Sequence, residues 1–93
     1  MDQVRAHLWI SGHFFGEAYR RRIAQAADML HVNGWLRRLV DGRLEAILEG
    51  EPESVEEAIR GSRRSGGGVS VSSVVVRWEG YLGEQAGFSL RVG

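Results

Sequence analysis

The amino-acid sequence predicts an α+β fold in which two helices cover one face of a mainly antiparallel, five-stranded sheet. Stretches in which apolar and polar residues alternate, as in half-buried strands, are interrupted twice by stretches with apolar residues at helical spacing. Asp41 and Gly42 give a hairpin signal between the two middle strands. The predicted order is strand, helix, strand, strand, helix, strand, with a short strand added at the end. This order is that of the ferredoxin-like split βαβ sandwich.

The first predicted strand comes from an alternating pattern over residues 4–10. His7 and Trp9 occupy polar-face positions of this pattern, so they should lie on the side of the sheet away from the core. The residues expected in the core are Val4, Ala6, Leu8 and Ile10.

A loop with two glycines, Gly12 and Gly16, connects this strand to the first helix. Such a loop points several backbone N–H groups into one concavity beside a helix N-terminus, where anions bind. Arg20, Arg21 and Arg22 then crowd the first helical turn, where the helix dipole opposes each cation by roughly a few tenths of a kcal/mol or more. A bound anion would relieve this conflict. We expect Arg21 and Arg22 to face solvent.

The remaining elements follow from the same patterns. The apolar stripe of the first helix consists of Tyr19, Ile23, Ala27 and Leu30, and that of the second consists of Val55, Ala58 and Ile59. Pro52 and the acidic residues around it suit the first turn of the second helix. The other predicted segments are strands over 35–39 and 43–49, a two-residue hairpin turn within 40–43, a loop over 61–68, and strands over 69–78 and 88–92.

The length of 93 residues and the hydrophobic content of 43% indicate one domain, residues 1–93, with a single core. The 12 basic and 12 acidic residues balance, so a general binder of polyanions is not expected. All the basic residues are arginine, which excludes lysine Schiff-base chemistry and leaves multidentate contacts to oxyanions possible.

Several classes of protein are disfavoured by what the sequence lacks. Without cysteine there is no disulfide, thiolate nucleophile or thiolate metal site. The three histidines have no ligand spacing, so we expect neither a metal nor another cofactor. No apolar run reaches membrane-spanning length, and no signal-peptide pattern is found. We therefore expect a soluble, cytoplasmic protein without a membrane partner.

Three segments of the chain carry a family resemblance. In the first, Gly12, Gly16 and Arg20 are spaced as in the pattern G-x-V-Q-G-V-x-F-R, with Tyr19 at its aromatic position. Residues 34–38 and 41–45 are similar to G-W-V-R-N followed by D-G-x-V-E, and residues 87–91 are similar to a last strand of the same family. Over nearly its whole length the chain thus resembles the acylphosphatases, small hydrolases of acyl phosphates.

The resemblance implies a site for an acyl phosphate, or for inorganic phosphate or sulfate. In such enzymes the loop amides and the arginine hold the phosphoryl group, an asparagine at the end of the second strand orients the attacking water, and no metal is needed. Carried over to this chain, Arg20 is the phosphate ligand. The substrate-binding amides are those of His13, Phe14, Phe15, Gly16, Glu17 and Ala18.

The chain departs from the family pattern at three positions. Arg38 stands where the family has the water-orienting asparagine, and arginine has only donors, so it cannot accept a hydrogen bond from water. Phe15 and Glu17 replace glutamine and valine in the loop, and Glu17 adds a negative charge unless its side chain turns outward. We therefore assign Arg20 and Arg38 to the catalytic site and expect impaired hydrolysis. Asn33 is a candidate for a displaced water-holding residue, although it suits a turn better.

Two other functions fit the same fold less directly. A non-catalytic module that binds a phosphate- or carboxylate-bearing ligand, or a protein, could use the same arginines. RNA binding would need aromatic platforms on the open face, and the third strand offers Glu45 and Glu49 there instead. We therefore expect no nucleic-acid partner, and we expect a monomer.

Overall fold

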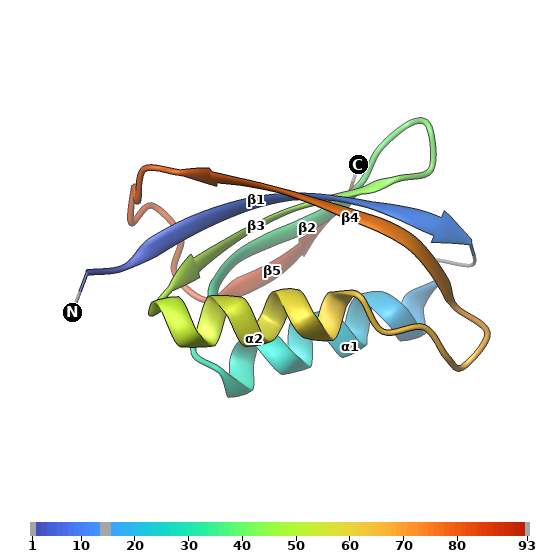
Figure 1. Ribbon diagram of the computed structural model, residues 1–93, viewed down its shortest axis with the longest axis horizontal. Helices are drawn as coiled ribbons and strands as arrows, with labels where there is room; N and C mark the ends of the chain where they lie inside the picture. Colours follow the sequence, from blue (N-terminus) through green and yellow to red (C-terminus); the bar gives the residue numbers. More distant parts are fainter. Residues whose placement is uncertain (1, 14–15, 93) are drawn as a thin grey trace.

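The fold consists of one five-stranded sheet with two helices packed on one of its faces (Figure 1). The computed structural model describes residues 2–13 and 16–92. In chain order the elements are β1 (Val4–His13), α1 (Glu17–Met29), β2 (Asn33–Arg38), β3 (Leu44–Gly50), α2 (Pro52–Ser62), β4 (Ser70–Glu79) and β5 (Phe88–Arg91). The predicted fold class, with its added terminal strand, is confirmed.

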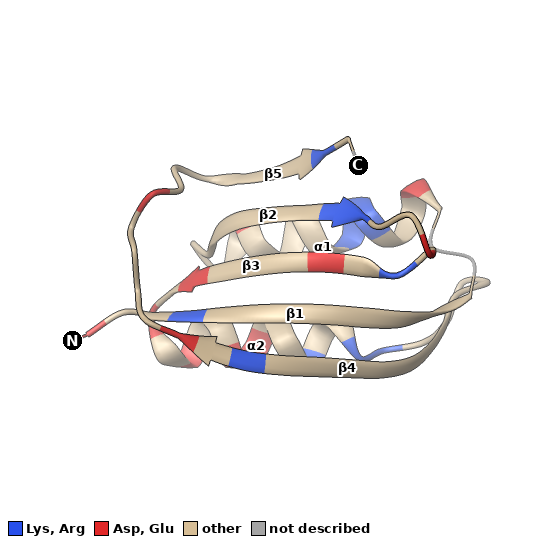
Figure 2. Ribbon diagram, turned by 90° about the horizontal axis from the view of Figure 1, so that it is seen from above, with Lys and Arg blue, Asp and Glu red and all other residues tan. Residues whose placement is uncertain are grey.

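The strands lie in the order β4-β1-β3-β2-β5, so β4 and β5 form the two edges of the sheet (Figure 2). Neighbouring strands are antiparallel except for β2 and β5, which run parallel. The register between β1 and β4 shifts between Ser11 and Gly12, close to the point where β1 leads to the first helix. The parallel pair aligns Arg37 of β2 with Arg91 of β5, which brings the last strand next to the end of β2.

The core lies between the sheet and the two helices. The buried apolar side chains come from alternate positions of the inner strands and from one stripe of each helix, as the sequence patterns predict. Its members include Ala6, Leu8 and Ile10 of β1, Tyr19, Ile23 and Ala27 of α1, Leu36 of β2, Leu44, Ala46 and Leu48 of β3, and Val55, Ala58 and Ile59 of α2.

The turn between β2 and β3 differs from the prediction. Leu39 N–H donates to the Arg43 carbonyl at 2.7 Å, and Gly42 N–H donates to the Leu39 carbonyl at 3.0 Å. Val40 and Asp41 therefore occupy the centre of the turn, and Gly42 follows in a left-handed conformation with φ 92°. The predicted two-residue Asp-Gly turn is wrong, because the glycine is used one position later, as in three-residue hairpin loops.

Arg22 also differs from the prediction that it faces solvent. Its Nη2 donates to the carbonyl oxygens of Gly61 at 3.3 Å and Arg64 at 2.8 Å, near the end of α2. Beside it, the buried Tyr19 hydroxyl donates to the Ser62 carbonyl at 2.7 Å. Burial raises the pKa of Tyr19 to about 12, with Arg22 opposing the shift, so the phenol stays a hydrogen-bond donor. These contacts fix the first turns of α1 against the end of α2.

Figure 2 is seen from the side of the sheet that the helices leave open, and charged residues of β1, β3 and β4 form ion pairs on this face. Glu49 and Glu45 of β3 are buried, with exposed fractions of 1% and 8%. Arg5 of β1 bonds to Glu49 at 3.2 Å and to Glu79 of β4 at 3.0 Å. The two ring nitrogens of His7 lie 2.6 Å from a Glu45 oxygen and 2.8 Å from a Glu79 oxygen. The acids that the sequence places on an open face are thus buried in ion pairs.

Candidate anion site at one end of the sheet

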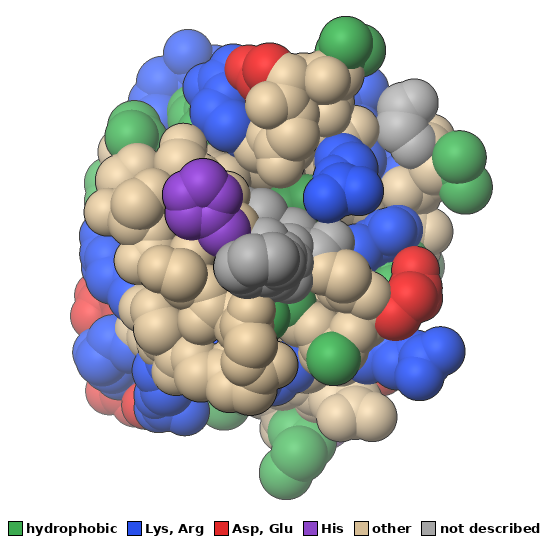
Figure 3. All heavy atoms as spheres, turned by 90° about the vertical axis from the view of Figure 1, so that its right-hand side faces the viewer, with side chains coloured by type: hydrophobic (Ala, Val, Ile, Leu, Met, Phe, Trp, Pro, Cys, Tyr) green, Lys and Arg blue, Asp and Glu red, His purple; other side chains and the backbone are tan. Residues whose placement is uncertain are grey.

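Arg20 and Arg38 line one cavity, although they are 18 positions apart in the sequence. Arg20 lies in the first turns of α1 and Arg38 is the last residue of β2. The cavity has a volume of about 350 Å³, and the other described residues that line it are Leu39, Val40, Arg91 and Val92. Figure 3 faces this end of the molecule and shows basic side chains at several places on it. The structure therefore brings together the two arginines that the sequence assigned to one site.

Arg20 has hydrogen-bonding capacity that its described neighbours do not use. Its side chain is 20% exposed. Nη1 lies 3.5 Å from a Glu17 carboxylate oxygen, and Nη2 lies 3.5 Å from the carbonyl oxygen of Arg91, both at the long limit of a hydrogen bond. Its Nε is buried and has no partner among the described residues. An unpaired buried donor is costly, and an anion at this position would satisfy it.

Arg38 contributes a second positive charge to the cavity. It projects from the same side of β2 as the buried Leu36, since side chains two positions apart share a face. Its side chain is exposed. Within residues 2–13 and 16–92, none of the ion pairs of the structure involves Arg38. Its guanidinium is therefore available to a ligand.

The N-terminus of α1 lies beside Arg20. Gly16 is the N-cap and makes no side-chain cap bond, and the first helical hydrogen bond runs from Arg20 N–H to the Gly16 carbonyl at 3.4 Å. The N–H groups of Glu17 and Ala18 therefore have no acceptor within the helix. The Glu17 side chain is 64% exposed, so solvent and salt screen its charge. These amides and Arg20 together favour an anion.

The structure describes four of the six residues whose amides are predicted to bind the substrate. His13 is the exposed last residue of β1, and Gly16, Glu17 and Ala18 form the cap and first turn of α1. Phe14 and Phe15 lie outside the described residues. The convergence of the loop amides on one anion therefore stays a prediction.

The sequence did not identify the residues that β5 and the hairpin add to the cavity. Arg91 and Val92 reach it because β5 pairs with β2, and the Arg91 carbonyl accepts a bond from Arg20. The Arg91 guanidinium stacks 4.7 Å from the ring centroid of Trp35. The sequence does offer one indication that Val40 belongs to the site: it is an aliphatic residue in a turn, where polar residues are usual.

Asn33 does not take the place of a water-orienting residue. It begins β2, whereas Arg38 ends it, and an extended chain rises about 3.3 Å per residue. Five such steps separate the two residues by roughly 16 Å. Asn33 Oδ1 also accepts a hydrogen bond from Gly87 N–H at 3.0 Å. Asn33 therefore secures the start of β5 instead.

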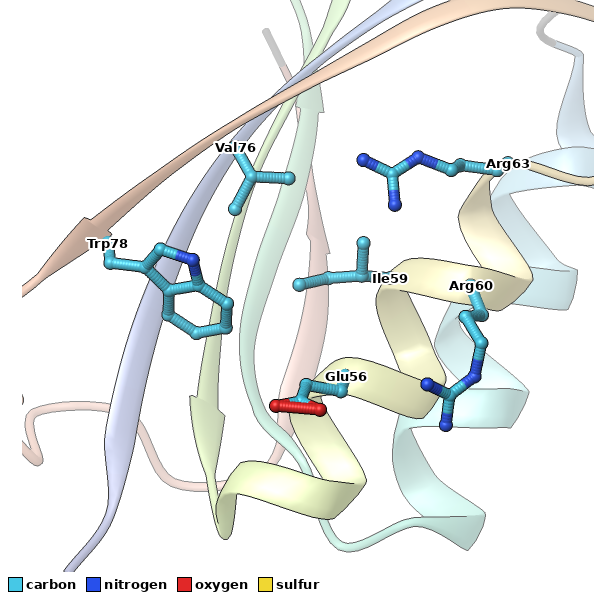
Figure 4. Close-up of a pocket in the computed structure, with 6 residues that line it drawn as sticks. All are labelled: Glu56, Ile59, Arg60, Arg63, Val76 and Trp78. Carbon is cyan, nitrogen blue, oxygen red and sulfur yellow. The ribbon is translucent and has the colours of Figure 1, made fainter.

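A second cavity of about 270 Å³ lies between α2 and the edge strand β4 (Figure 4). Trp78 and Val76 of β4 face Ile59 of α2 across it, and its charged lining residues are Glu56, Arg60 and Arg63. Arg60 pairs with Glu57 at 3.0 Å, and Arg63 donates to the Val74 carbonyl at 3.5 Å. None of the predicted site residues lines this cavity.

The described part of the chain contains no group of three or more His, Cys, Asp or Glu side chains that could hold a metal ion. None of the helices in that part is long and apolar enough to cross a membrane.

Comparisons with known proteins converge on one family. The acylphosphatase family model matches residues 6–90. An acylphosphatase from Syntrophobacter fumaroxidans is 40% identical over 93 residues, which are 100% of this chain and 96% of that protein. One from Roseiflexus sp. is 40% identical over 90 residues, 97% of each chain. The crystal structure of the acylphosphatase from Bacillus subtilis has a TM-score of 0.88 at 20% identity and covers 95% of this chain and 98% of that one. At this identity the structural likeness shows the fold alone.

Proposed function

The chain belongs to the acylphosphatase family, and from this premise we propose that it hydrolyses acyl phosphates to a carboxylate and inorganic phosphate at the cavity beside Arg20. The observation that carries the proposal is the Arg20 side chain, which has a buried, unpaired Nε next to the N-terminal amides of α1. The phosphoryl group of the substrate satisfies these donors.

The proposed reaction requires little covalent chemistry from the protein itself. A water oxygen attacks phosphorus, the bond between phosphorus and the acyl oxygen breaks, and the carboxylate leaves. Phosphoryl transfer of this kind is accelerated by positioning and by stabilising the charge on the phosphoryl oxygens. Arg20 and the amides of the first turn of α1 supply both.

Arg38 makes the proposed hydrolysis slow. Its guanidinium adds positive charge that strengthens binding of the phosphoryl group, but it has no acceptor with which to orient the water. Asn33 cannot compensate, because its amide oxygen is bonded to Gly87 at the other end of β2. Loss of one oriented contact to the reacting water costs roughly two to three orders of magnitude in rate.

The first test measures turnover of benzoyl phosphate by the parent chain, Arg20→Ala, Arg38→Asn and a control, Arg21→Ala. Arg20→Ala is expected to lower kcat/KM by about 10²–10³-fold. Arg38→Asn is expected to raise kcat by at least about tenfold, because an acceptor for water is restored. Arg21 is exposed on α1 and is not a lining residue of the cavity, so its variant should resemble the parent.

The outcomes separate the parts of the proposal. Turnover that survives Arg20→Ala would contradict the assignment of the phosphate ligand. If the parent already hydrolyses benzoyl phosphate rapidly and Arg38→Asn does not raise kcat, the role given to Arg38 is contradicted.

A second candidate function is a non-catalytic module that binds a phosphate- or carboxylate-bearing ligand. The presence of two arginines at one cavity favours this candidate, because two guanidinium groups bind an anion well but do not orient a water molecule to attack it. Binding of phosphate that depends on Arg20, without turnover of any acyl phosphate by the parent, would support this candidate over the enzyme.

A further inference from the structure

We propose that the part of the cavity formed by Leu39, Val40 and Val92 binds the acyl group, and that the protein therefore prefers acyl phosphates with an apolar acyl part of several carbons. The inference rests on the proposed function, because it takes Arg20 and Arg38 as the ligands of the phosphoryl end. It adds the class of acyl group and the residues that select it.

The first argument is the composition of the lining. Three of the six described lining residues are aliphatic, and they are consecutive with the cationic ones: Leu39 and Val40 follow Arg38, and Val92 follows Arg91. Val40 and Val92 are fully exposed, with relative exposures of 110% and 101%. Single exposed valines are ordinary, but these two lie at one cavity and have no apolar cover in the described structure.

The second argument is the way in which the fold brings Val40 and Val92 to the same end of the sheet. The hairpin turn places Val40 at its centre, just beyond the end of β2. The parallel pairing of β2 with β5 brings Val92 to the same end, and the Arg91 carbonyl is bonded to Arg20. The aliphatic residues thus lie at the same cavity as the guanidinium groups, an arrangement complementary to a ligand with an anionic head and an apolar tail.

The third argument is size. Cavities that bind small molecules usually measure about 300–1,000 Å³, and this one, at about 350 Å³, lies near the lower limit. It suits a short aliphatic or single-ring acyl phosphate. A methylene group that is fully buried strengthens binding by about fourfold, and one that stays partly in water by about twofold.

The experiment measures binding and turnover with ligands of increasing apolar length. Methyl-, butyl- and hexylphosphonate carry the same anionic head and cannot be hydrolysed, so calorimetry gives their Kd without any need for catalysis. Acetyl, butyryl and benzoyl phosphate give kcat/KM. The variant is Val40→Ser combined with Val92→Ser. The control is Val75→Ser, since Val75 is 57% exposed on β4 and does not line the cavity.

For the parent and Val75→Ser we expect the Kd to fall about two- to fourfold per added methylene from methyl- to butylphosphonate. The double serine variant should lose most of this gain in affinity with the length of the apolar chain. In the acyl phosphate series, kcat/KM should rise from acetyl to benzoyl phosphate in the parent and become nearly level in the double variant.

Equal Kd values along the phosphonate series would overturn the acyl subsite and leave the anion site intact. A gain with length that the double variant retains would also overturn it, because the tail would then bind elsewhere. If none of the phosphonates binds and no acyl phosphate is hydrolysed, the anion site itself fails, and the proposed function falls together with this inference.

Discussion

At the level of single residues, His7 has an unusual environment on the open face of the sheet. A carboxylate lies at each ring nitrogen, Glu45 at 2.6 Å and Glu79 at 2.8 Å, and the His7 side chain is only 14% exposed. Each ring nitrogen of His7 thus has a carboxylate oxygen within hydrogen-bonding distance. His7 therefore links β1 to the strands on either side of it.

Replacement of His7 by glutamine should lower the free energy of unfolding by about 1–3 kcal/mol, because one of the two carboxylates loses its hydrogen bond to the ring. Urea unfolding at pH 6 measures the change. His31→Asn is the control: His31 is exposed at φ 57°, a conformation that asparagine adopts, so a change within about 0.5 kcal/mol is expected. An equal effect of both substitutions would contradict the bridging role of His7.

The acids of this face also predict how stability depends on pH. Hydrogen bonds from Arg77, His7 and Arg5 lower the pKa of Glu79 to about 2. Burial alone would raise the pKa of Glu45, but bonds from His7 and Arg37 outweigh it and lower that pKa as well. Because a glutamate in the unfolded chain titrates near about 4.3, the stabilisation is present above this pH and is lost as the pH falls towards about 2.

The free energy of unfolding should therefore decrease between pH 5 and pH 2, and it should decrease less steeply in Glu79→Gln, which has no carboxylate to protonate. Urea unfolding at a series of pH values gives both slopes. Identical slopes in the two proteins would show that Glu79 is not responsible.

At the level of elements, Gly34 allows β2 to approach β3. The residue has φ 147°, and a Cβ atom built on it would lie 1.8 Å from the Ile47 carbonyl oxygen of β3. A backbone atom cannot move aside as the end of a flexible side chain can. Gly34 therefore has a structural reason to be glycine, separate from any role in the site.

Gly34→Ala should destabilise the protein by about 3 kcal/mol or more, because strands must separate to admit the methyl group. Gly61→Ala is the matched control, since Gly61 lies in α2 and a methyl group added there would meet nothing within 4 Å. It should raise stability by up to about 1 kcal/mol through helix propensity. Thermal unfolding should show a lower melting temperature for Gly34→Ala and an equal or higher one for Gly61→Ala. A Gly34→Ala protein as stable as the parent would contradict the close approach of β2 to β3.

Most elements of the fold could be predicted because their periodicity is strong. The alternation in β1 and the apolar stripes of both helices identify their buried residues directly. The hairpin turn could not be assigned correctly, since Asp41–Gly42 fits two kinds of loop and only the hydrogen bonds of Leu39 distinguish them. The burial of Glu45 and Glu49 depends on strand register, which the pattern of one strand does not contain.

The candidate site was predictable to a similar extent. Arg20 and Arg38 follow from the family resemblance, and they do line one cavity. Arg91 and Val92 were missed, because their positions depend on which edge of the sheet the last strand joins. A four-residue strand carries no signal for that choice. Val40 was missed because its place at the cavity depends on the geometry of the β2–β3 turn.

At the level of the whole molecule, an anion that binds only the folded state should raise its thermal stability. At a phosphate concentration of ten times Kd, mass action adds about 1.4 kcal/mol. For a domain of this size the melting temperature should then rise by roughly 5–10 °C. Arg20→Ala should remove most of this rise, and sodium chloride at equal ionic strength is the control. An unchanged melting temperature at saturating phosphate in both proteins would count against the anion site.

The cavity beside Arg20 draws on the start of α1, the end of β2 and the end of β5, so it exists only once the final segment has joined the sheet. Contacts between residues so distant along the chain form late, since a long loop must close first. During renaturation, helical circular dichroism should then recover ahead of ligand affinity. The lag between the two signals would measure when β5 docks relative to the formation of the helices.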